Sequence, residues 1–246
     1  MADILTIPSE KKEKFYKEII THALESSVPF LIGGTYAVME YTGIKRPTKD
    51  LDFFCKAGDY PKLLSYMEER GYKTRVEDER FVAKIIKGDL FVDLILGSFN
   101  SSGFVDDSWF QHAPVKTFLG MKVKFLSPVD LIWSKIYIKS RSHYHGSDIN
   151  HIILKQGDHI DWKSLLMRME QHWEVLLATI INFRFVYPSE RDIIPEWLIQ
   201  ELTERFTYQR KSPKPEKRVC RGRLFSDTEY EIDFREWGFE DTFSIP

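Results

Sequence analysis

The segment from Phe30 to Phe54, FLIGGTYAVMEYTGIKRPTKDLDFF, constrains the fold of this chain more than any other. It runs from a short apolar stretch through two glycines and a helical pattern that ends at Gly43 to a second apolar stretch that holds two aspartates. This order predicts a buried strand, a turn, a helix and a second strand. The glycines and the aspartates would form two walls of one pocket, although turn chemistry and a solvated strand edge explain each feature locally.

The rest of the first half predicts an α+β fold, with a small mixed sheet flanked by helices. Apolar residues recur at helical spacing between Ser9 and Pro29, which indicates an amphipathic first helix. Two hairpins are expected, one through Lys87-Gly88-Asp89 and one through Leu119-Gly120.

The second half of the chain has helical periods throughout. Ser127 and Pro128 have the residue types that begin a helix, and helical spacing continues to about Phe206. We therefore expect three segments: an α+β core in residues 1–126, a helical domain in 127–206 and a basic, then acidic, C-terminal tail in 207–246.

The composition is that of a soluble globular protein, with 43% hydrophobic and 29% charged residues and a formal net charge of −2. A charge this close to zero gives no general electrostatic reason for a nucleic-acid or membrane partner. No apolar run approaches the roughly 20 residues of a membrane helix, and the N-terminus has no signal-peptide pattern. With only two cysteines, far apart, the chain is expected to be cytoplasmic.

The tail has an uneven charge distribution. Residues 208–223 hold seven Lys and Arg residues against a single acid, and residues 224–246 are acidic and aromatic. We favour a solvated tail that folds back on its acidic partner segment. Contact with nucleic acid through residues 210–223 is the less favoured alternative.

Three aspartates are the candidate metal ligands and catalytic groups. Asp50 and Asp52 are two residues apart on a predicted strand, so both side chains project from one face and Leu51 projects from the other. Asp93 is the only charged residue in LFVDLILG, and a carboxylate in so apolar a strand needs a partner or a function. If the two strands are neighbours, three carboxylates converge. Such a set can hold two Mg²⁺ or Mn²⁺ ions, about 3.5 to 4 Å apart.

Gly33 and Gly34 supply the complement to these carboxylates. Two glycines between a strand and a helix let the backbone approach a ligand closely, and a helix N-terminus offers free N–H groups to phosphate oxygens. The Thr35 hydroxyl could add a further contact.

The combined pattern resembles the nucleotidyltransferase superfamily that includes DNA polymerase β, the aminoglycoside nucleotidyltransferases and the AbiEii-type toxins. The family has a glycine pair, an Asp-x-Asp about fifteen residues on, and a third carboxylate on a neighbouring strand. The form Arg-x-Thr-x-Asp-x-Asp, from Arg46 to Asp52, is most similar to the AbiEii-type and uncharacterised bacterial nucleotidyltransferase-like branches. Lys135 and Asp148 match later motifs of those branches. The resemblance covers roughly residues 30–206.

The resemblance implies a polymerase β-like nucleotidyltransferase core followed by an all-helical domain. It implies an enzyme that moves a nucleoside monophosphate from an NTP such as ATP to a hydroxyl acceptor and releases pyrophosphate. The metal ligands and catalytic residues would be Asp50, Asp52 and Asp93. The implied nucleotide-binding residues are Gly33, Gly34, Thr35, Arg46, Thr48, Lys135 and Asp148.

Three alternatives stay open on the residues alone. The chain could be a non-catalytic regulatory or antitoxin-like relative that binds a nucleotide or a partner, although the retention of all three carboxylates counts against this. It could also modify RNA through its basic tail. Lys135, Lys139 and Arg141 follow helical spacing and could face a triphosphate, or could form a solvated face. A metal site at His145, Asp148 and His151 is disfavoured, because Gly146 interrupts that helix.

Overall fold

The computed structural model describes residues 9–97, 103–226 and 228–241. The chain divides into two compact units, Met1–Leu131 and Ile132–Pro246. Helix α5, Pro128–Ile136, contains the division. The three-segment division expected from the sequence stays a prediction.

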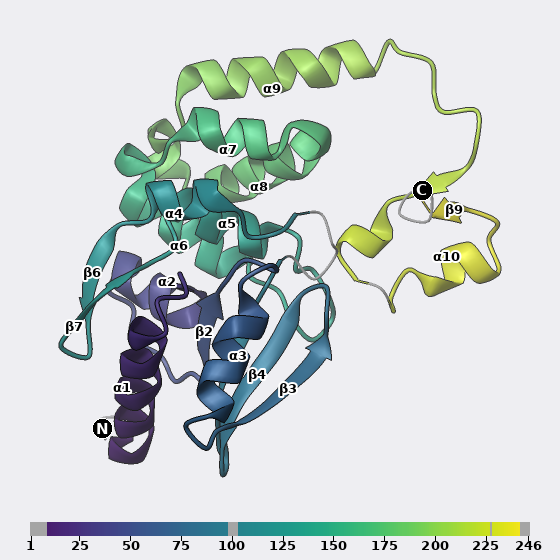
Figure 1. The fold of residues 1–246 in the computed structure, drawn as a ribbon. Helices are drawn as coiled ribbons and strands as arrows, with labels where there is room; N and C mark the ends of the chain where they lie inside the picture. The colour runs from purple at the N-terminus through teal and green to yellow at the C-terminus, as the bar shows by residue number, and fades with distance from the viewer. Residues whose placement is uncertain (1–8, 98–102, 227, 242–246) are drawn as a thin grey trace, which may run out of the picture. The chain divides into compact units, whose positions relative to one another are not determined.

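The first unit combines a sheet with helices (Figure 1). Its elements are α1 (Glu10–Glu25), β1 (Leu31–Ile32), α2 (Gly34–Thr42), β2 (Leu51–Phe54), α3 (Tyr60–Glu68), β3 (Lys73–Asp78), β4 (Val82–Lys87), β5 (Leu90–Ile95), α4 (Asp107–His112), β6 (Val115–Phe118) and β7 (Met121–Lys124). Five strands form one sheet in the order β1-β2-β5-β4-β3. Only β2 and β5 run parallel, so the sheet is mixed, as expected.

Both expected hairpins are confirmed. Strands β4 and β5 pair up to Lys87 and Leu90, which leaves a two-residue turn of Gly88 and Asp89. Strands β6 and β7 pair up to Phe118 and Met121 around the Leu119-Gly120 turn. A two-residue turn fixes the register of the strands that it joins, and hence which side chains face each other across the sheet.

The sequence did not predict strand β3. Its residues, KTRVED, are mostly exposed and lack the apolar alternation that identifies a half-buried strand. β3 is an edge strand, where charged side chains are ordinary and the pairing with β4 supplies the backbone hydrogen bonds.

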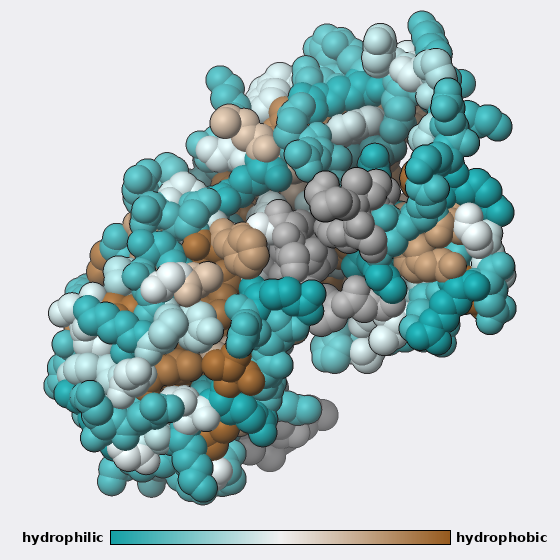
Figure 2. Space-filling view, turned by 45° about the vertical axis from the view of Figure 1, so that its right-hand side comes forward, coloured by the Kyte–Doolittle hydropathy of each residue, from teal (hydrophilic) through white to brown (hydrophobic). Residues whose placement is uncertain are grey.

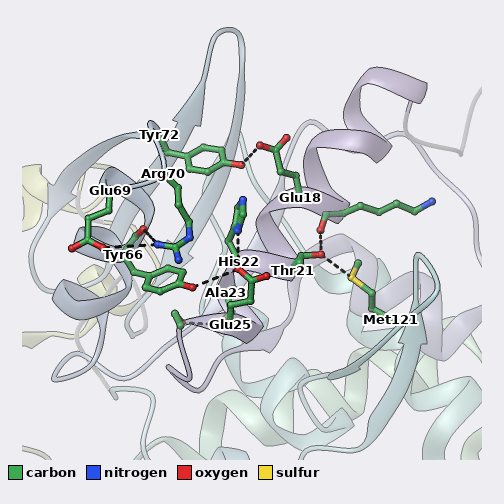
Figure 3. A network of polar contacts seen from close by, with 12 residues as sticks. Glu18, Thr21, His22, Ala23, Glu25, Tyr66, Glu69, Arg70, Tyr72 and Met121 are labelled. Carbon is green, nitrogen blue, oxygen red and sulfur yellow. Dashed lines mark hydrogen bonds and ion pairs between the residues drawn. The ribbon is translucent and has the colours of Figure 1, made fainter.

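Helix α1 is held to its neighbours by a buried face and by a polar network (Figure 3). The buried residues are Phe15, Tyr16, Ile19, Ile20 and Ala23. On the polar side, the Tyr72 hydroxyl donates to the Glu18 carboxylate, and Thr21 Oγ1 lies 3.6 Å from Met121 Sδ. These contacts link α1 to the residue before β3 and to the first residue of β7.

The second unit is helical, as expected, and ends in a short tail structure. Its elements are α6 (Gly146–Gln156), η1 (Gly157–His159), α7 (Trp162–Arg168), η2 (Glu170–His172), α8 (Trp173–Val186), η3 (Pro188–Ile193), α9 (Glu196–Gln209), β8 (Val219–Cys220), η4 (Gly222–Leu224), α10 (Glu231–Arg235) and β9 (Glu240–Asp241). Helix breaks at Gly157 and Pro188 are confirmed, since α6 gives way to η1 at Gly157 and η3 begins at Pro188. The expected break at Gly146 is wrong, because α5 already ends at Ile136 and Gly146 is the first residue of α6.

The expected helical face of Lys135, Lys139 and Arg141 does not exist. Helix α5 ends at Ile136, where the chain turns. Lys139 then forms an isolated β-bridge with Tyr144. The three cations therefore do not share one helical face, although Lys135 and Lys139 line a common cavity.

The basic tail segment folds back on the acidic one, as favoured from the sequence. Strand β8 pairs with β9 in parallel. Arg223 Nη1 lies 2.6 Å from Asp241 Oδ2, and Lys217 Nζ lies 3.0 Å from Glu240 Oε2. Part of the positive charge of the tail is thus neutralised within the unit.

The face seen in Figure 2 is mostly hydrophilic, with apolar residues exposed in small separate groups. Among the described residues, no helix combines the length and the apolar character needed to cross a membrane.

Candidate active site

Charged side chains lie side by side on three neighbouring strands of the sheet, β2, β5 and β4. Asp52 on β2 is the register partner of Asp93 on β5, and Asp93 is the register partner of Lys84 on β4. Register partners lie on the same face of a sheet, about 5 Å apart. The opposite face is apolar and fully buried at Leu51 and Phe53. The parallel pairing of β2 and β5 thus brings together two of the predicted carboxylates.

Asp50 lies one residue before β2, not on the strand as the sequence indicated. The loop that carries Asp50 is anchored at two points. Thr48 Oγ1 lies 3.4 Å from Asp50 Oδ1, and Lys12 Nζ donates to the carbonyl oxygens of Thr48 and Lys49 at 3.2 and 3.0 Å. Helix α1 therefore positions the first aspartate through the backbone of the loop.

The two glycines have different structural roles. A Cβ atom on Gly33 would lie 2.2 Å from the Phe54 ring, so Gly33 permits close packing in the core. Gly34 has φ +55°, and a Cβ atom there would lie 1.6 Å from Asp52 Oδ2. The Asp52 carboxylate thus lies directly against the backbone of Gly34, and any side chain at this position would displace it.

Arg46 and Thr35 meet at the start of α2. Arg46 Nη2 lies 3.4 Å from Thr35 Oγ1, which is in the first turn of the helix. A guanidinium group beside a helix N-terminus adds a full positive charge to the free N–H groups of the first turn. This end of α2 is suited to bind an anion next to Asp52.

The electrostatics of the carboxylates reflect burial and mutual repulsion. Burial raises the pKa of the Asp93 carboxyl, Lys84 lowers it, and the charges of Asp50 and Glu77 raise it. Burial, followed by the charge of Asp50, raises the pKa of Tyr36 to about 12. A cation among these carboxylates would relieve the repulsion.

Lys84 is the residue that the sequence interpretation missed. Its ammonium lies 2.7 Å from Asp93 Oδ1 and 3.7 Å from Glu77 Oε2. The hairpin itself carried the signal, since a two-residue turn at Gly88 and Asp89 makes residue 84 the partner of residue 93. The one lysine inside the apolar run of β4 could have been assigned to Asp93 in this way.

The carboxylate oxygens of Asp50, Asp52 and Asp93 are suitable ligands for a divalent metal, but the side chains do not surround a metal site in this conformation. Carboxylate oxygens are the ligands that Mg²⁺ and Mn²⁺ prefer. Within residues 9–97, 103–226 and 228–241, no three His, Cys, Asp or Glu side chains converge closely enough to hold a metal ion. The Oδ1 atom of Asp93 is instead engaged by Lys84.

Lys135 and Asp148 pair with each other inside the helical unit. Lys135 Nζ lies 3.1 Å from Asp148 Oδ2, and His145 Nδ1 lies 3.4 Å from the same oxygen. Lys135 also lines a cavity of about 260 Å³ together with Lys139 and Asn182. The structure thus brings Lys135 and Asp148, both predicted from the sequence, together as an ion pair within the second unit.

A small mixed sheet with register-paired carboxylates, next to a helix that begins at a glycine, defines a protein of the nucleotidyltransferase fold. The chain belongs to the family described as nucleotidyl transferase of unknown function (DUF2204), whose model matches residues 12–177. The finer resemblance to AbiEii-type proteins stays a prediction. Comparison with curated proteins gives no match.

The comparison with solved structures finds an antibiotic-resistance factor among the similar chains. The solution structure of the antibiotic-resistance factor ANT(2'')-Ia is 19% identical, with a TM-score of 0.50, over 69% of this chain and 96% of that chain. A crystal structure of ANT(2'')-Ia with adenylyl-2''-tobramycin is 18% identical, with a TM-score of 0.48, over 65% and 96%. An antigenic nucleotidyltransferase-like protein from Paracoccidioides brasiliensis is 18% identical, with a TM-score of 0.48, over 75% and 93%.

Proposed function

We propose that this chain transfers a nucleoside monophosphate from an NTP to a hydroxyl acceptor and releases pyrophosphate, with Mg²⁺ or Mn²⁺ as cofactor. The observation that carries the proposal is the register pairing of Asp52 with Asp93, next to the glycine-led start of α2. Family membership supports the same reaction class. The acceptor is defined here only by its hydroxyl group.

The three aspartates would hold the divalent cations, with Asp50 and Asp52 as the principal ligands. The bound metal would neutralise phosphate charge and polarise the acceptor oxygen. Asp93 would accept the hydroxyl proton as the acceptor oxygen bonds to the α-phosphorus and the bond to the pyrophosphate oxygen breaks. The raised pKa of Asp93 supports this role, because a more basic carboxylate is a better proton acceptor.

The start of α2 would bind the triphosphate. The Gly33 N–H donates to the Asp52 carbonyl at 3.0 Å, so the proposed phosphate contacts fall to the N–H groups of Gly34 and Thr35. Arg46 would add a positive charge, and Thr48 would orient Asp50. Triphosphate binding would rest on the placement of these groups and on positive charge. Placement and charge also dominate the catalysis of phosphoryl transfer.

The helical unit would contribute to nucleotide binding through its own cavity. Lys135 would be oriented there by Asp148, and Lys139 would supply a second cation to the same wall. Burial lowers the pKa of Lys139, which is expected for an ammonium group that is partly removed from water.

The test is label transfer from each α-labelled NTP with Mg²⁺ or Mn²⁺, with the protein alone and with cell extract. Label on an acceptor, lost in Asp52→Asn and Asp93→Asn but kept in Asp89→Asn, is expected. Asp89 is a matched control, because it is an exposed aspartate on the β4–β5 turn that pairs with Lys11. Full metal-dependent transfer by Asp52→Asn would refute the mechanism.

One observation favours a non-catalytic alternative, in which the chain binds nucleotide without turning it over. Asp93 is paired with Lys84 and therefore already has a counter-charge. Calorimetry that shows NTP binding without metal, unaffected by Asp93→Ala, would support this alternative over the enzyme.

A further inference from the structure

Lys84 supplies the counter-charge of Asp93 in this structure. The Nζ–Oδ1 distance is 2.7 Å, and the two side chains are 18% and 15% exposed. The ammonium also lies 4.3 Å from the centre of the Phe91 ring, on the same face of β5 as Asp93. The lysine is therefore held at the carboxylate by charge, by the strand register and by a ring contact.

A second acid lies within reach of the same ammonium. Glu77 Oε2 is 3.7 Å from Lys84 Nζ. Glu77 lies at the point where the β3–β4 register shifts, between Val76 and Asp78, and such irregularities redirect side chains. Lys84 Nζ thus lies within ion-pair distance of both acids, so it would keep a counter-charge on leaving Asp93, and Glu77 also pairs with Arg75.

We propose that Lys84 is a positioning residue that neutralises Asp93 in the metal-free protein and gives it up to the divalent cation, moving toward Glu77. This inference rests on the proposed function, because it takes Asp93 to be a metal ligand. Lysine and metal would compete for one carboxylate, so each weakens the binding of the other by the same factor.

The test measures Mn²⁺ affinity by calorimetry in the absence of nucleotide. Lys84→Met keeps the aliphatic stem over Phe91 and removes the competing charge. It should bind Mn²⁺ roughly tenfold more tightly than the unmodified protein, within the range of such couplings. Lys87→Met removes the same charge from an exposed lysine of the same strand that pairs with Glu18, and should leave the affinity unchanged. Equal affinities in all three proteins would overturn the inference.

A double-mutant cycle of Glu77 and Lys84 distinguishes competition for Asp93 from a general effect of charge on Mn²⁺ binding. Glu77→Gln removes the alternative partner of Lys84, so it should weaken Mn²⁺ binding in the presence of Lys84. In the Lys84→Met background the same change should have no effect. Equal weakening in both backgrounds would show a long-range charge effect and would contradict the proposed movement.

Stability provides a readout that does not depend on activity. Without its lysine, Asp93 is a half-buried charge, so Lys84→Met should lower the melting temperature. Addition of Mn²⁺ should raise the melting temperature of Lys84→Met by more than it raises that of the unmodified protein. Lys84→Arg should behave like the unmodified protein. Tighter Mn²⁺ binding by Lys84→Met, together with no label transfer by the unmodified protein, would overturn the proposed reaction but support the competition.

Discussion

Lys135 Nζ lies 3.1 Å from Asp148 Oδ2, in an ion pair whose side chains are 7% and 2% exposed. The family resemblance implied that both residues bind the nucleotide. A buried pair of this kind has a structural role of its own, because removal of one partner leaves an uncompensated charge in the interior. The two roles make different predictions for substitutions.

Lys135→Met is expected to lower the free energy of unfolding by about 3 to 5 kcal/mol, since it removes the ammonium that pairs with the buried Asp148 carboxylate. Asp148→Asn should have a smaller effect in the Lys135→Met background than alone. Urea unfolding followed by circular dichroism measures both. If Lys135→Met unfolds like the unmodified protein but loses NTP affinity, the lysine serves the ligand and not the fold.

Gly34→Ala is expected to disrupt the site through two effects. Alanine at φ +55° costs about 1 to 2 kcal/mol, and its Cβ would also displace the Asp52 carboxylate. Gly43→Ala is a matched control, because Gly43 ends the same helix at φ +71° with open space around it. Both variants should lose stability, but only Gly34→Ala should lose Mn²⁺ binding in a calorimetric titration. Equal Mn²⁺ affinity in the two variants would contradict the assigned contact.

The stability of the helical unit should depend on pH through His172. Its Nδ1 atom lies 2.8 Å from the Tyr137 hydroxyl, and burial, with the charge of Arg221, lowers the pKa of His172. The unfolded chain, with a pKa of about 6.5, then binds a proton at a higher pH than the folded one. Stability should therefore be complete above about pH 6.5 and fall as the pH drops through the folded pKa.

Thermal unfolding between pH 5 and 8 measures this effect. His172→Gln keeps a polar partner for Tyr137 but does not titrate, so the fall in melting temperature in this window should be smaller. An identical pH profile for the two proteins would exclude His172 as its source.

Arg223→Gln is expected to loosen the tail structure. Asp241, its partner at 2.6 Å, is only 8% exposed at its side chain, so the loss of the cation leaves a buried carboxylate. Hydrogen exchange at Val219 and Cys220 should become faster, because β8 pairs with the strand that holds Asp241. Lys217→Gln breaks an exposed pair and should have little effect, as surface ion pairs contribute little. Equal exchange rates in both variants would contradict the role of Arg223.

Local patterns predicted the elements near the site but not the contacts among them. The helix over Gly34–Thr42, its end at Gly43 and the β4–β5 turn follow from residue types that act over a few positions. The exposed strand β3 escaped prediction, because its pairing with β4 rather than any periodicity makes it a strand.

The sequence by itself determined which residue types are present for nucleotidyl transfer: two glycines before a helix, an Asp-x-Asp and a third aspartate in an apolar strand. Only the tertiary structure decided that Asp52 and Asp93 are neighbours, because this depends on the parallel pairing of β2 with β5. The register that gives Asp93 its lysine follows from the local β4–β5 turn. The interaction energy of two charges depends on the distance between them in space. Strand register fixes that distance, and separation along the chain does not.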